Sequence, residues 1–136
     1  TYYTTGCPSW NWFYPYQYAP LATTISQHIK TYSNPRYGVT KPSLPFQQLL
    51  SVLPPKSSHL LPFPLNNCLS DKKSKMAVFC PEKITIDLAG KRREWEGITI
   101  IPMVDQKIVK EIYKKNERFI NEKDLERNIT HMLKQY

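Results

Sequence analysis

Carboxylates that could hold catalytic metal ions occur only in the second half of the chain. Glu94 and Glu96 flank Trp95 in a segment predicted to be a strand, so both side chains would point to one face. Asp87 lies across the preceding turn. Convergent carboxylates of this kind can clamp the paired cations of a phosphodiester-cleaving site. The alternative, which we favour, is an exposed hairpin edge beside the basic residues 91–93 that binds no metal.

The other residue types that could support catalysis or metal binding are isolated. They are the histidines His28, His59 and His131 and the cysteines Cys7, Cys68 and Cys80. No Cys-x-x-Cys pair is present, and no histidine lies at a spacing typical of zinc ligands. We therefore expect three reduced thiols, typical of an intracellular protein. The chain is predicted to contain no catalytic residues and no metal site.

An aromatic segment, residues 9–20 (SWNWFYPYQYAP), is the most unusual feature of the sequence. It contains six aromatic residues in twelve positions and no charged residue. One interpretation is a buried aromatic seam, which we favour for most of its Tyr and Phe residues. The other is a surface on which nucleobases stack, since an aromatic ring contributes about 1–3 kcal/mol per stacked base. Trp10 and Trp12 are the candidates for that role.

Charge is distributed unevenly along the chain. The formal net charge is +8, residues 1–70 contain no Asp or Glu, and all 11 acidic residues lie from Asp71 onward. The excess is compatible with a polyanionic partner, although the basic residues after Asp71 are interleaved with acids and suggest a solvated face. No apolar run approaches the roughly 18 residues that span a bilayer, so no membrane partner is expected. The chain opens on Thr1 without a Met, which favours a fragment of a longer protein.

Proline spacing and apolar periodicity predict short elements of both kinds. The expected helices cover residues 21–30, 45–53, 105–118 and a last one after Asn121, and the expected strands cover 77–79, 84–88 and 97–101, with a turn at 89–91. Apolar stripes at helical spacing predict the core: Phe46, Leu49, Leu50 and Leu53 in one helix, and Ile108, Val109, Ile112 and Tyr113 in another. Asp105 and Asn121 are the expected N-caps.

The predicted fold class is therefore mixed α+β, as a fragment of a larger enzyme. A Pro- and aromatic-rich helical front half precedes a small β-hairpin and two C-terminal helices. We expect segments at 1–70 (aromatic, Pro-rich and helical), 71–76 (a charged loop) and 77–136 (hairpin and helices).

Five blocks in order resemble the second conserved region of the Xrn-family 5′→3′ exoribonucleases. Residues 9–20 are similar to the family's SWxWYYPYHYAP, and residues 45–54 (PFQQLLSVLP) to its PFEQLxxVLP. The others are 87–91 with Trp95 (DLNGK…W in the family), 101–105 (LPFxDE) and 126–128 (ERN). Together they cover nearly the whole chain.

The resemblance implies processive removal of nucleotides from single-stranded RNA that carries a 5′-monophosphate. It implies that the two Mg²⁺ or Mn²⁺ ions are bound outside this fragment, by the N-terminal catalytic region of the same protein, and that this fragment shapes the RNA channel. Trp10 or Trp12, preferably Trp10, would stack on a base. A non-catalytic RNA-binding module and a purely structural scaffold domain remain the alternatives. The expected location is intracellular, with residues 93–96 favouring the cytoplasmic branch over the nuclear one.

The sequence departs from the family pattern at several positions. Gln17 replaces the usual His, and Gln47 and Gln106 replace the usual Glu. These changes call into question the hydrogen bonds that those side chains would make.

Overall fold

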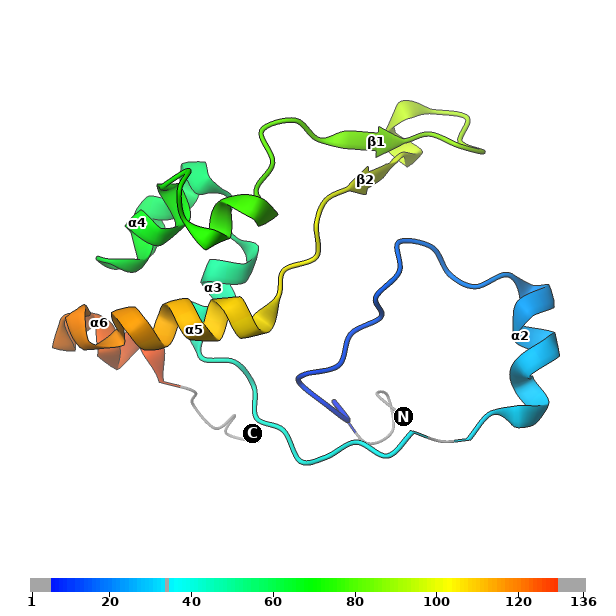
Figure 1. Ribbon diagram of the computed structural model, residues 1–136, viewed down its shortest axis with the longest axis horizontal. Coiled ribbons are helices and arrows are strands. Elements are labelled where there is room, and N and C mark those ends of the chain that lie inside the picture. Colours follow the sequence, from blue (N-terminus) through cyan, green and yellow to red (C-terminus); the bar gives the residue numbers. More distant parts are fainter. Residues whose placement is uncertain (1–5, 34, 130–136) are drawn as a thin grey trace, which may run out of the picture. The chain divides into compact units, whose positions relative to one another are not determined.

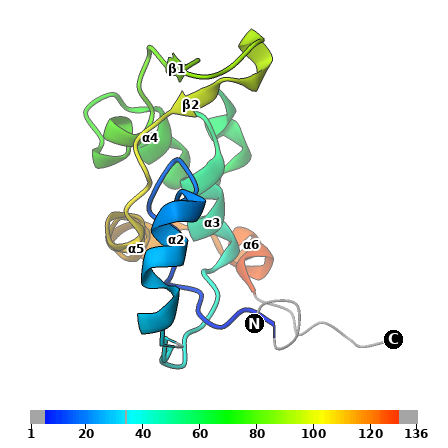
Figure 2. The same cartoon turned by 90° about the vertical axis from the view of Figure 1, so that its right-hand side faces the viewer.

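The polypeptide folds as two compact units, Thr1–Pro42 and Ser43–Tyr136, shown in Figures 1 and 2. This computed structural model describes residues 6–33 and 35–129. Helices and one small antiparallel sheet make up the regular structure, so the predicted mixed α+β class is confirmed. The charged segment 71–76 lies inside the second unit. None of the helices in these described stretches is long and apolar enough to cross a membrane.

The first unit contains helix α2 (Ala22–His28), which continues as a 3₁₀ turn, Ile29–Thr31. This confirms the helix predicted over 21–30. Elsewhere the described part of this unit has no helix or strand, as its prolines require. None of its described residues is buried, so this part of the chain has no hydrophobic core of its own.

The second unit is a helical cluster followed along the chain by a hairpin and two further helices. Its helices are α3 (Pro45–Val52), α4 (Leu65–Ser70), α5 (Gln106–Asn116) and α6 (Glu122–Leu125), and its strands are β1 (Thr85–Asp87) and β2 (Ile98–Ile100). Short 3₁₀ turns lie at Pro55–Leu60, Lys75–Phe79, Glu94–Glu96, Glu117–Phe119 and Glu126–Asn128. Asp105 and Asn121 cap α5 and α6 by accepting from the backbone N–H groups of Lys107 and Asp124, as predicted.

The core forms where α5 packs against both α3 and α4. Its buried side chains are Phe46, Leu50, Leu61, Leu65, Leu69, Met76, Val109, Ile112, Tyr113 and Ile120. Both predicted stripes are confirmed, because their remaining members, Leu49, Leu53 and Ile108, pack against this cluster. Helix α4, which supplies Leu65 and Leu69, was not predicted.

The N-terminus of α3 is capped by two side chains rather than one. Leu44 occupies the N-cap position but has no side-chain oxygen, so it cannot accept a hydrogen bond. Gln47 Oε1 accepts from the Leu44 N–H (3.1 Å), and Asn128 Oδ1 accepts from the Phe46 N–H (2.9 Å). Gln47, which stands where the family usually has Glu, can cap the helix in this way because an amide oxygen accepts a hydrogen bond as a carboxylate does.

Asn128 and Tyr113 share a buried hydrogen-bond chain. Asn128 Nδ2 donates to the Tyr113 hydroxyl (2.7 Å), and that hydroxyl donates to Glu117 Oε1 (2.9 Å). Burial, with the Glu117 carboxylate as a further cause, raises the pKa of Tyr113 to about 12. The neutral phenol is therefore favoured in the folded protein.

This pKa predicts a loss of stability in alkali. The stabilisation by neutral Tyr113 should be complete below pH about 10, where tyrosines of the unfolded chain begin to ionise, and should be lost as the pH rises to about 12. We expect the free energy of unfolding to fall by about 3 kcal/mol from this group over that range. Urea unfolding at successive pH values measures it. Tyr113→Phe should remove this component, and an unchanged alkaline profile in that variant would contradict the assignment.

The hairpin is the only sheet in the described residues. Strands β1 and β2 pair antiparallel, with Thr85 opposite Ile100 and Asp87 opposite Ile98. Gly90 adopts a left-handed φ of +70° in the predicted turn, which favours glycine. Trp95 is 76% exposed, and the Arg93 guanidinium carbon lies 5.9 Å from the centroid of its ring.

Two strand predictions were wrong. Residues 77–79 belong to a 3₁₀ turn that Ser74 caps by accepting from the Met76 N–H, and a local cap of this kind favours a helical turn over an extended strand. Residues 94–96 also form a 3₁₀ turn, closed by the Gly97 N–H donating to the Glu94 carbonyl (3.0 Å). Glu94 and Glu96 are therefore not alternate residues of a strand.

Candidate nucleic-acid interface

The aromatic segment lies in the first unit and is exposed within this chain. The exposed fractions of its six aromatic side chains range from 43% for Tyr14 to 69% for Tyr16, with Trp10 at 53% and Trp12 at 58%. The expected buried seam does not form among the described residues of this unit. The physical reason is the absence of a core there, since an extended, Pro-containing segment presents its rings with no second apolar layer to cover them.

Contacts within the first unit nevertheless hold both tryptophans. The backbone N–H of Trp10 donates to Thr40 Oγ1 (2.8 Å) across 30 residues of sequence. The Trp12 ring meets Tyr37 edge to face, with 6.3 Å between centroids. The segment is thus tied to residues 37–40 at two neighbouring points, which restricts where the indole rings can lie.

Tyrosines brace the middle of the aromatic segment. The Tyr14 hydroxyl donates to the Tyr18 carbonyl (2.8 Å), and the Tyr14 and Tyr16 rings contact edge to face at 5.4 Å. Edge-to-face packing is a favourable geometry for aromatic pairs. These contacts fix the tyrosine side chains relative to one another but leave large parts of the rings accessible, so the segment forms an exposed aromatic surface.

The electrostatics of this surface suit a polyanion better than a cation. The first unit has no acidic residue, and its charged side chains are Lys30, Arg36 and Lys41. Aromatic rings that bind bases, beside cations that bind phosphate, are the usual components of single-strand binding surfaces. The arrangement can bind and orient a strand.

Two of the carboxylates considered as a possible cluster, Asp87 and Glu96, make hydrogen bonds to nearby backbone groups of the hairpin. Asp87 Oδ1 accepts from the Ala89 N–H (2.8 Å), and Glu96 Oε2 accepts from the Arg92 N–H (3.3 Å). Across residues 6–33 and 35–129, no three His, Cys, Asp or Glu side chains are grouped so that they could hold a metal ion. The described residues therefore do not fit a two-metal site.

The histidines and cysteines lie at separate places in the sequence, and the Cys7 thiol contacts the aromatic segment by donating to the Ser9 carbonyl (3.3 Å). His28 and His59 are exposed on separate helical turns, and His131 lies outside the described residues. The three cysteines are free. Burial raises the pKa of the Cys68 and Cys80 thiols, which keeps both in the less reactive protonated form.

Thr40 and Tyr37 are the site residues that sequence reasoning missed. Neither stands out by type or by spacing, and their contacts join positions separated by 25 and 30 residues. No local signal in the sequence identifies such partners.

The sequence matches the family model of the Xrn1 helical domain over residues 1–135. The chain belongs to this family, and the resemblance inferred from the five motif blocks is confirmed.

Individual relatives agree with this assignment. The chain is 45% identical over 105 residues to 5′-3′ exoribonuclease 2 of Saccharomyces cerevisiae, covering 77% of this chain and 10% of that protein. It is 41% identical over 105 residues to the protein of the same name in Schizosaccharomyces pombe, with the same coverage. The corresponding Candida albicans protein is 36% identical over 128 residues, covering 93% of this chain. The chain spans only 10 to 13% of the length of these relatives.

Proposed function

We propose that this chain is part of a 5′→3′ exoribonuclease and forms one side of its path for single-stranded RNA. The observation that supports this proposal most directly is the pair of half-exposed tryptophans, Trp10 and Trp12. They lie on an acid-free surface in a member of the Xrn1 helical-domain family. Relatives over 77% or more of the chain are named 5′-3′ exoribonucleases, which supports the reaction class.

In this proposal the chain positions RNA and the rest of the longer protein cleaves it. The whole enzyme would remove nucleotides one after another from RNA with a 5′-monophosphate. Its Mg²⁺ or Mn²⁺ ions would be held by the N-terminal catalytic region, outside this chain. Trp10 or Trp12 would stack on a base, while Thr40 holds the backbone of Trp10 and Tyr37 packs against the ring of Trp12. Stacking requires an accessible base face, so paired strands would be disfavoured.

Tryptophan fluorescence tests this proposal directly. A Trp95→Phe background removes the third indole, leaving emission from Trp10 and Trp12 alone. A short 5′-monophosphorylated single-stranded RNA should quench that emission. Trp10→Ala or Trp12→Ala should weaken binding by about 5- to 150-fold, corresponding to about 1–3 kcal/mol for one stacked base.

Trp95→Ala in the otherwise unchanged chain is the matched control, because Trp95 is also exposed but lies in the hairpin. It should leave the affinity unchanged. Absence of quenching would favour a structural scaffold. RNA hydrolysis by the pure chain in the presence of Mg²⁺ would contradict the assignment of the metal site to another region.

A further inference from the structure

One face of the hairpin consists of exposed aliphatic side chains. Strand residues that stand opposite each other share a face, so Ile86 and Thr99 point to the same side. Residues two positions away along each strand point to that side as well. The large side chains of this face are about half exposed, from 44% for Leu88 to 57% for Ile84. We call Ile84, Ile86, Leu88 and Ile101 the aliphatic face.

Gly97 allows two of these side chains to lie against the backbone of the opposite segment. A Cβ atom at Gly97 would overlap Ile86 Cγ2 and would lie 2.8 Å from Leu88 Cδ2. A residue with a side chain at this position would displace both, and close approach of this kind is one reason for glycine beside a strand. The glycine therefore keeps the aliphatic face closely packed.

The other face of the hairpin is mixed in character. It carries Thr85 opposite Ile100 and Asp87 opposite Ile98. The apolar excess thus belongs to the aliphatic face. An antiparallel sheet with one apolar face is typical of a sheet that packs that face against a second layer.

The hairpin has no such second layer among the described residues. Each strand has three residues, and a two-stranded ribbon is at best marginally stable in water without further strands or a helix packed against it. In the part of the chain that the structure describes, the core residues and the side chains packed against them all lie outside residues 81–103. The aliphatic face therefore lacks the layer that would stabilise it.

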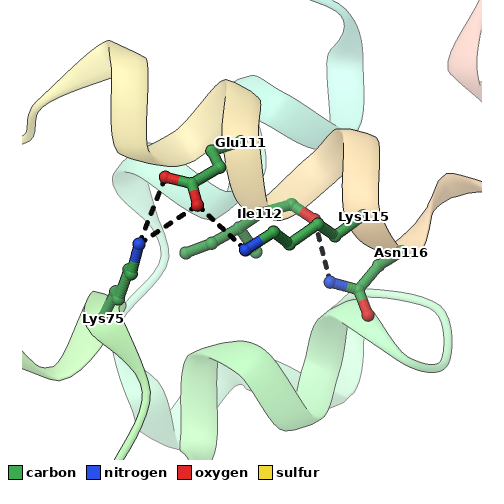
Figure 3. Close-up of polar contacts among 5 residues, drawn as sticks. All are labelled: Lys75, Glu111, Ile112, Lys115 and Asn116. Atoms are coloured by element: carbon green, nitrogen blue, oxygen red, sulfur yellow. Dashed lines mark hydrogen bonds and ion pairs between the residues drawn. The ribbon is translucent and has the colours of Figure 1, made fainter.

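The helical cluster, in contrast, is closed by its own contacts. Its buried side chains come from its own helices and turns. The Glu111 carboxylate of α5 also accepts hydrogen bonds from Lys75 (3.1 Å) and Lys115 (2.9 Å), and Figure 3 shows it between these two side chains. Because the cluster does not depend on the hairpin, substitutions on the aliphatic face should leave it folded.

The small size of the aliphatic face points to a partner on the same polypeptide. Stable complexes of separate proteins use about 20–30 residues on each side, far more than the hairpin offers. A segment of the same polypeptide binds at a high effective concentration, so a small face is enough. The relatives have ample chain for such a segment, since this chain spans only 10 to 13% of their length.

We propose that the aliphatic face is an intramolecular docking surface. In the whole protein, a segment from outside residues 1–136 packs its own aliphatic side chains on this face and completes the missing layer. The segment is uncharged at the contact, because the face has no side chain that could pair with a buried charge. This inference rests on one part of the proposed function, that the chain belongs to a longer protein, and is independent of RNA binding.

Hydrogen exchange in the hairpin tests this surface. Mass spectrometry measures the exchange of residues 84–101 in the whole protein and in the chain 1–136, both without RNA. In the chain alone the hairpin opens readily, so its amides should exchange nearly as fast as those of an unstructured peptide. In the whole protein the same amides should exchange at least about 100-fold more slowly. Equal rates in the two proteins would overturn the proposal.

Two substitutions of Ile86 in the whole protein separate docking from strand formation. Ile86→Thr and Ile86→Val both introduce β-branched side chains of similar size, which suit a strand. Under the docked segment, however, the threonine hydroxyl would be buried without a partner. Exchange in the hairpin should therefore be about 5- to 150-fold faster in Ile86→Thr than in Ile86→Val. Indistinguishable exchange in the two variants would show that nothing packs on the face.

Ile129 provides the matched control, since it is 55% exposed against 54% for Ile86. Ile129→Thr and Ile129→Val should give equal exchange rates in the hairpin. A large difference between them would show that the threonine effect is not specific to the aliphatic face, and would count against the proposal.

Other occupants predict different results. If sedimentation of the chain 1–136 shows a dimer that Ile86→Thr dissociates, the face joins two copies and the proposal fails. If a separate protein covers the face, the hairpin stays unprotected in the pure whole protein, which also contradicts the proposal. RNA quenching of Trp10 and Trp12 is a separate signal. Quenching together with an unprotected hairpin would remove the docking surface and leave the proposed function standing.

Discussion

Replacing Asn128 by alanine should lower the free energy of unfolding by about 2–4 kcal/mol. Asn128 is the buried polar residue of the described core region, with 6% of its surface exposed. Its removal leaves the Phe46 N–H without its acceptor and the Tyr113 hydroxyl without a donor. A buried donor left unsatisfied costs about 1–3 kcal/mol, and the loss of the second bond adds to this. Chemical denaturation of the purified chain measures the change.

Asn116→Ala is the matched control for Asn128. The Asn116 side chain also makes one short hydrogen bond, from Nδ2 to the Ile112 carbonyl (2.8 Å), but it lies at the partly exposed end of α5. Water can replace that donor, so the variant should lose less than about 1 kcal/mol. Equal losses in the two variants would show that Asn128 is no more important than an ordinary surface amide.

Leu65→Ala should destabilise the chain by about 3–5 kcal/mol, because truncation leaves a cavity that neighbouring side chains fill only in part. Leu65 is fully buried at the start of α4, in the cluster that joins α4 to α3 and α5. Leu60→Ala provides the same chemical change at a side chain that is 51% exposed, and it should cost less than about 1 kcal/mol. Thermal and urea unfolding of both variants measure the difference. Comparable losses would place Leu65 outside the core.

Elements with complete local signals were predictable. Helix α5 has an Asp105 cap and a clear apolar stripe, and its prediction was confirmed to within two residues of its end. The same holds for α3 between Pro45 and Pro54, and for the hairpin around Gly90. For α5 and the hairpin, neighbouring residues specify the element, whereas the cap of α3 also needs the distant Asn128.

Elements without such signals were missed or misassigned. Helix α4 has six residues and no side-chain cap, so its pattern is too short to show a helical period. Residues 77–79 form a short apolar run, which is equally compatible with a strand or a buried helical turn. The exposure of the aromatic segment depends on the lack of a core in the first unit, which composition does not reveal.

In the candidate site, too, the contacts between residues far apart in the sequence could not be predicted from the sequence. Trp10 and Trp12 could be chosen by residue type, but their partners Thr40 and Tyr37 could not.

The bond between Asn128 and Phe46 also has a consequence during synthesis on the ribosome. Because 82 residues separate the two partners, the first turn of α3 emerges long before the side chain that completes its cap. At about 5–20 residues per second, the interval is roughly 4–16 s. Through most of that interval α5 is not yet available to cover the apolar face of α3. The nascent chain therefore carries an uncovered hydrophobic segment that holdase chaperones can recognise.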